Sequence, residues 1–89
     1  MPLDELLMIG LRRREGVHLE ELAKKSGWTK KECDKHLKLL DKYWLTYLNE
    51  GYLLRKNGRY YLSDPKGMQI SNQILIQMFL WWDSLDRDQ

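Results

Sequence analysis

Histidine and cysteine, which often act as base, nucleophile or zinc ligand, are few in this sequence. The two histidines, His18 and His36, and the single cysteine, Cys33, are separated along the chain. A catalytic constellation places a nucleophile, a base and an orienting group together, and no carboxylate pair accompanies either histidine. One cysteine and two scattered histidines are also too few for a four-ligand zinc site. We therefore predict that the chain contains no catalytic, cofactor-binding or metal-binding residue.

Basic side chains offer a different chemistry, the binding of phosphate. Residues 24–62 contain ten Lys and Arg against four Asp and Glu, while the segments on either side each carry a net charge of −2. A basic excess on one part of a chain is typical of nucleic-acid binders. A lysine-rich surface that only contacts solvent gives the same count, so both interpretations stay open.

Five of these residues are the candidates for contact with DNA: Lys30, Lys31, Lys35, Arg55 and Arg59. The three lysines fall in the first turns of a predicted helix, and the two arginines fall in a predicted hairpin. The first turns of that helix contain no outward Arg, Asn or Gln that would pair with a base edge. Lysine alone favours contact with phosphates over reading of sequence.

The size and composition of the chain indicate one globular domain. The sequence has 89 residues, 43% hydrophobic and 31% charged, which suits a single folded unit with a modest core. We expect residues 1–83 to form this domain and residues 84–89 to fray. The acidic start does not resemble a signal peptide, and the longest apolar run, at 74–82, is too short to span a bilayer. A cytoplasmic location is the expectation.

Three helices are predicted in the first half of the chain. Apolar residues at helical spacing indicate helices at about 3–14 and 19–26, each followed by a glycine that favours a helix end. A third helix is predicted from Thr29 to about residue 50. Thr29 and Glu32 have the spacing of a capping box, in which each side chain bonds the backbone N–H of the other residue. Cys33 falls on the apolar side of this helix, where we expect it to be buried.

A β-hairpin and a final helix follow. Asn57-Gly58 separates two runs rich in Tyr and Leu, and this is a strong signal for a type I′ turn between strands at about 52–56 and 59–63. The last helix is predicted at about 66–83. The expected fold is mainly α with a β-hairpin: a winged-helix-like domain with three helices, a two-stranded wing and a C-terminal helix.

Two longer segments resemble the C-terminal domain of the oxygen-independent coproporphyrinogen III oxidases and the related HemW-type heme chaperones, which are radical SAM proteins. The first is LDELLMIGLRRREGV at 3–17, similar to a glycine–leucine–arginine segment of that family. The second is YLSDPKGMQISNQI at 61–74, similar to a strand, a turn with proline, lysine and glycine, and a helix that begins near Ser71-Asn72. Asp64 stands where the family often has threonine. The resemblance covers about residues 3–80.

The resemblance implies a non-catalytic accessory or docking domain of the heme pathway. The family's CxxxCxxC motif, which binds a 4Fe-4S cluster and S-adenosylmethionine, is absent here. Both cofactors are therefore implied only for a radical SAM barrel upstream in the same parent chain. That barrel is the expected partner, with a porphyrin or heme near the interface. The sequence does not separate the oxidase from the chaperone branch, and the alternative is a free-standing winged-helix DNA-binding protein.

The expected docking residues lie at the end of the first helix and along the last one. They are Arg12, Arg13, Ser71, Asn72, Met78, Phe79, Trp81 and Trp82. The last helix carries apolar side chains in nearly every direction, and exposed aromatic patches often mark interfaces. The alternative is that this helix closes over the first and third helices and buries most of these side chains.

Overall fold

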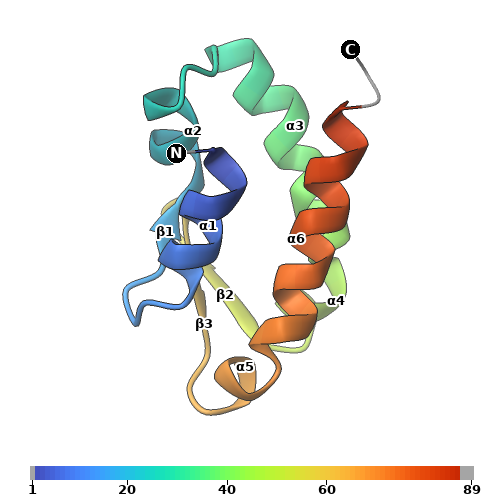
Figure 1. The fold of residues 1–89 in the computed structure, drawn as a ribbon. Helices are drawn as coiled ribbons and strands as arrows, with labels where there is room; N and C mark the ends of the chain where they lie inside the picture. Colours follow the sequence, from blue (N-terminus) through green and yellow to red (C-terminus); the bar gives the residue numbers. More distant parts are fainter. Residues whose placement is uncertain (1, 87–89) are drawn as a thin grey trace.

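The computed structural model describes residues 2–86, and it is mainly helical with a small antiparallel sheet (Figure 1). The elements in chain order are α1 (Leu3–Leu11), β1 (Val17–His18), α2 (Leu19–Lys25), α3 (Lys30–Tyr43), α4 (Leu45–Asn49), β2 (Leu53–Lys56), β3 (Arg59–Leu62), α5 (Lys66–Gln69) and α6 (Ser71–Asp86). Long helix α6 packs along both α1 and α3, and the sheet lies at one end of α1.

The capping box predicted at Thr29 and the turn predicted at Asn57-Gly58 are both present. Thr29 Oγ1 accepts a hydrogen bond from the Glu32 N–H at 3.1 Å, and Glu32 Oε1 accepts one from the Thr29 N–H at 3.0 Å. This capping box starts α3. Asn57 and Gly58 have φ values of 54° and 81°, as a type I′ turn requires. The turn joins β2 to β3, which pair in register from Leu53↔Leu62 to Lys56↔Arg59.

The predicted two-stranded hairpin forms, but the sheet has a third strand that was not predicted. Strand β1 pairs with β3 through Val17↔Tyr60 and His18↔Arg59, which gives the order β1-β3-β2. A strand of two residues is too short to show a periodic pattern in the sequence. Gly16 allows the chain to approach β3 this closely. Any other residue would place a Cβ 2.0 Å from the Tyr60 carbonyl oxygen.

The helix boundaries also differ from the prediction at four points. Helix α1 ends at Leu11, and the basic residues expected in its last turn follow it. The third helix is interrupted at Trp44, where α4 begins. The last helix is divided at Ile70 into α5 and α6. Helix α6 extends to Asp86, beyond the predicted end at residue 83, and residues 87–89 of the expected tail lie outside the described residues.

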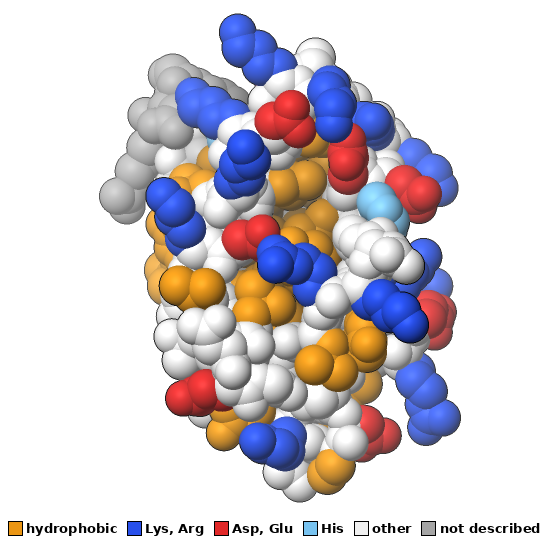
Figure 2. Space-filling model, turned by 180° about the vertical axis from the view of Figure 1, so that it is seen from behind, with side chains coloured by type: hydrophobic (Ala, Val, Ile, Leu, Met, Phe, Trp, Pro, Cys, Tyr) orange, Lys and Arg blue, Asp and Glu red, His pale blue; other side chains and the backbone are white. Residues whose placement is uncertain are grey.

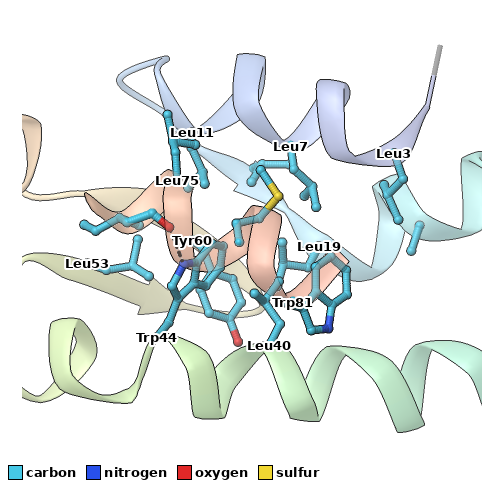
Figure 3. Packing of buried hydrophobic residues seen from close by; sticks show 14 of the residues in the cluster. Leu3, Leu7, Leu11, Leu19, Leu40, Trp44, Leu53, Tyr60, Leu75 and Trp81 are labelled. Atoms are coloured by element: carbon cyan, nitrogen blue, oxygen red, sulfur yellow. Dashed lines mark hydrogen bonds between the residues drawn. The ribbon is translucent and has the colours of Figure 1, made fainter. Parts of the chain in front are cut away.

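A single core joins all of the larger elements (Figure 3). Trp44 is fully buried, and its indole N–H donates to the Ile74 carbonyl oxygen at 2.9 Å. This bond fixes the junction of α3 and α4 against α6. The other buried hydrophobic residues are Leu3, Leu7, Leu11, Val17, Leu19, Ala23, Cys33, Leu40, Leu53, Tyr60, Leu62, Ile74, Leu75, Met78 and Trp81.

Candidate functional site

Helix α6 has one apolar face in the core and a second apolar stripe that faces outward. Met78 and Trp81 are both 0% exposed. They therefore belong to the core, and the expectation that they lie on a docking surface is wrong. Ile76 and Leu80, which were not among the expected residues, are 56% and 49% exposed. Their i, i+4 spacing places them side by side on the outer face of the helix.

The tryptophans near the end of α6 pack on the turn between α2 and α3. Trp81 donates its indole N–H to the His36 carbonyl oxygen at 2.8 Å. The Trp82 ring is stacked on the Trp28 ring with centroids 6.4 Å apart, and Trp28 also meets the His36 ring edge to face at 5.3 Å. Packing in this cluster explains why the Trp82 side chain is only partly exposed. The role of Trp28 was not evident from the sequence because its partners are distant along the chain.

A groove runs beside the outer face of α6. It has a volume of about 530 Å³ and is lined by Tyr43, Thr46, Tyr47, Glu50, Tyr52, Ile70, Gln73 and Gln77. A second hollow continues from Tyr43 to Leu80, Asp83 and Ser84. We call Ile76, Leu80 and the groove residues Tyr43 and Tyr47 the outer α6 surface. It combines aliphatic and phenolic side chains, a composition that suits a protein interface.

The remaining expected docking residues are spread along the chain. Arg12 and Arg13 are exposed in the turn after α1, and Arg13 lines a hollow between α1 and α2. Ser71 is half-buried and Asn72 is exposed in the first turn of α6. Phe79 is partly buried against the core.

The five DNA-contact candidates are all exposed, but three have partners within the domain. Lys30 lies 3.0 Å from Glu20 Oε1 and 3.5 Å from Asp34 Oδ1. The hydrogen bond to Glu20 raises the pKa of Lys30, and the same contact lowers the pKa of Glu20. Arg59 donates to the carbonyl oxygens of Glu15 and Gly16, both at 3.4 Å.

Arg55 belongs to a network that joins the hairpin to α3. Its Nη1 lies 2.8 Å from Asp41 Oδ2, and the Tyr60 hydroxyl donates to the other Asp41 oxygen. Arg55 also donates to the Tyr60 oxygen at 3.4 Å, and this contact helps to raise its pKa. Burial is the main cause that raises the pKa of Tyr60 to about 12. Within residues 2–86, Lys31 and Lys35 form no ion pair.

The histidines and the cysteine have structural positions. His18 Nδ1 accepts a hydrogen bond from the Glu21 N–H at 3.2 Å and so caps α2, a role that was not predicted from the sequence. Cys33 is 2% exposed, and burial raises the pKa of its thiol. In the described part of the chain, no three His, Cys, Asp or Glu side chains are grouped as metal ligands.

Within residues 2–86, no helix combines the length and the apolar character needed to cross a bilayer. Comparisons of the chain with protein-family models, with curated proteins and with solved structures give no match.

Proposed function

We propose that this chain is a non-catalytic accessory domain that docks through its outer α6 surface onto a radical SAM barrel. In this proposal the domain is a winged helix, and the barrel lies upstream in the same parent protein of the coproporphyrinogen oxidase or heme chaperone type. The 4Fe-4S cluster, the S-adenosylmethionine and any porphyrin or heme would be bound by that barrel or at its interface.

The order of the elements supports the winged-helix part of the proposal. Strand β1 lies between α1 and α2, and the β2–β3 hairpin follows α3 and α4. The Arg55–Asp41 ion pair connects the hairpin to α3. A winged helix needs a helix, a short strand, two helices and a hairpin in this order, and here the short helix α4 is added before the hairpin.

The two family-like segments have clear structural roles, which supports a resemblance in fold. A Cβ on Gly10 would lie 2.9 Å from Val17 Cβ, so this glycine allows β1 to approach α1. A Cβ on Gly67 would lie 2.0 Å from the Tyr52 carbonyl oxygen. The Ser63 hydroxyl completes this contact, since it accepts from the Gly67 N–H at 3.0 Å and donates to the Tyr52 carbonyl oxygen at 3.1 Å. These residues shape the domain, and none is placed for chemistry.

The exposure of Ile76 and Leu80 is the observation that carries the docking part. Two adjacent aliphatic side chains that are about half exposed lose apolar surface when a partner covers them. Covering the exposed half of each side chain is worth about 1 kcal/mol, from 1.5–3 kcal/mol for full burial. Together they would contribute about 2 kcal/mol, or about a 30-fold change in the dissociation constant.

Titration calorimetry with a separately produced barrel of this family, lacking its own C-terminal domain, tests the proposal. We expect binding, and we expect the double variant Ile76→Gln/Leu80→Gln to weaken it by about 30-fold. Ile9→Gln/Leu45→Gln is the matched control, because Ile9 and Leu45 are 39% and 53% exposed on α1 and α4. Absence of binding by the unaltered chain, or an equal loss in both double variants, would contradict the proposal.

A further inference from the structure

The outward side of α3 carries a row of four lysines: Lys31, Lys35, Lys38 and Lys42. Their spacings of four, three and four residues place them on one line along the helix, because an α-helix has 3.6 residues per turn. The row extends for about 16 Å at 1.5 Å per residue. All four side chains are exposed, while Cys33 and Leu40 of the same helix are buried in the core.

The carboxylates near this row already have other partners. Asp34 pairs with Lys30, and Asp41 pairs with Arg55 and accepts from Tyr60. Glu32 accepts the hydrogen bond of the α3 capping box. Within residues 2–86, no ion pair neutralises any lysine of the row. The row is therefore a line of exposed lysines on α3 that form no ion pair.

The tip of the β2–β3 hairpin adjoins the row. One hollow is lined by Lys38, Asp34 and Asp41 of α3 and by Gly58 of the hairpin turn. Lys56, next to that turn, is exposed. Figure 2, which views the molecule from behind Figure 1, shows Lys and Arg side chains spread widely over that face of the domain. Lys38 of the row and the hairpin turn therefore lie at the same hollow.

We propose that the α3 lysine row and the hairpin tip bind the phosphate backbone of duplex DNA without reading its sequence. The major groove of B-DNA is about 12 Å wide and admits an α-helix, whereas the major groove of duplex RNA is too narrow for side-chain access. Lysine ammonium groups are flexible point charges that suit phosphates on either wall of the groove. This property goes beyond docking and depends on charged side chains that are not part of the outer α6 surface.

Fluorescence anisotropy of the whole chain with a labelled DNA duplex of arbitrary sequence tests this inference. Contact of four lysines with phosphates predicts a slope of about −3.6 for the logarithm of the association constant against the logarithm of salt concentration. The double variant Lys35→Gln/Lys38→Gln should reduce the slope by about 1.8. Arg12→Gln/Arg14→Gln removes the same charge from the turn after α1 and should leave the slope nearly unchanged. Circular dichroism verifies that each variant is folded.

Three results would overturn the inference. The first is the absence of binding at about 20 mM salt, because binding to phosphates strengthens as the salt concentration falls. The second is an equal change of slope in both double variants, which would indicate only net charge. The third is tighter binding of polyglutamate than of duplex DNA, which would assign the row to an acidic protein partner.

Discussion

Replacing Tyr60 by phenylalanine tests the network that holds the hairpin against α3. Tyr60 is 6% exposed on β3, and its hydroxyl donates to Asp41 in the last turn of α3. The substitution removes this one hydroxyl and keeps the ring, which packs against Trp44 with centroids 5.7 Å apart. Asp41 keeps its 2.8 Å contact with Arg55, so the carboxylate is not left without a partner.

At pH 8 we expect Tyr60→Phe to lower the free energy of unfolding by about 1.5 kcal/mol. A hydrogen bond to a charged group contributes about 1.5–3 kcal/mol. The lower end applies because the side chains of Asp41 and Arg55 are 31% and 51% exposed, and solvent screens exposed ion pairs.

The difference between the two proteins should shrink in alkali. Tyrosine has a pKa of about 10 in an unfolded chain, and the folded structure raises the pKa of Tyr60 to about 12. A raised pKa stabilises the fold fully below about pH 10, and this stability is lost as pH rises from about 10 to 12. The loss is about 1.4 kcal/mol per pH unit. An initial advantage of about 1.5 kcal/mol therefore disappears near pH 11.

Urea unfolding followed by tryptophan fluorescence, at pH 8, 10 and 11, measures these free energies. Tyr61→Phe is the matched control on the same strand, since Tyr61 is half-buried. The lysines titrate alike in all three proteins, so their contribution cancels in the differences. A Tyr60→Phe difference that stays constant from pH 8 to pH 11 would refute the assignment of the raised pKa to Tyr60. Equal stability at pH 8 would refute the network itself.

Two further predictions concern residues in tight surroundings. Gly67→Ala should destabilise the domain by about 2–4 kcal/mol, because the added Cβ would lie 2.0 Å from the Tyr52 carbonyl oxygen. Gly51 has φ +79° and open space around it, so Gly51→Ala should lower the free energy of unfolding by only about 1–2 kcal/mol. Equal losses for the two variants in urea unfolding would contradict the clash at Gly67. Cys33 is buried and the pKa of its thiol is raised, so a disulfide reagent at pH 8 should label it only as the chain unfolds. Rapid labelling without denaturant would show that α3 does not bury it.

The parts of the fold that were predictable depend on neighbours in the sequence. The Thr29–Glu32 capping box and the Asn57-Gly58 turn are determined by residues within three positions of one another, and both formed as predicted. The short strand β1 depends on pairing with β3, more than forty residues away in the chain. The break at Trp44 depends on a hydrogen bond to Ile74. Neither partner is visible in a local pattern.

The candidate surfaces were harder to predict for a related reason. The last helix is apolar on several sides, so its sequence does not indicate which stripe faces the core. In the folded domain Met78 and Trp81 are buried. Trp81 faces α3, where its indole N–H donates to the His36 carbonyl oxygen. That packing turns Ile76 and Leu80 outward. The basic residues show the same effect, since ion pairs with distant carboxylates occupy Lys30 and Arg55 and leave the α3 lysine row unpaired.

The two proposed surfaces depend on different kinds of side chain, and this difference allows each to be tested without the other. The outer α6 surface depends on exposed aliphatic groups, so its interaction should depend little on salt. The α3 lysine row depends on exposed charge, so its interaction should weaken steeply as salt rises. Glutamine at Ile76 and Leu80 removes apolar surface without changing charge, and glutamine at Lys35 and Lys38 removes charge without adding apolar surface. Each pair of substitutions therefore removes one interaction and should leave the other intact, so that the failure of either proposal would not count against the other.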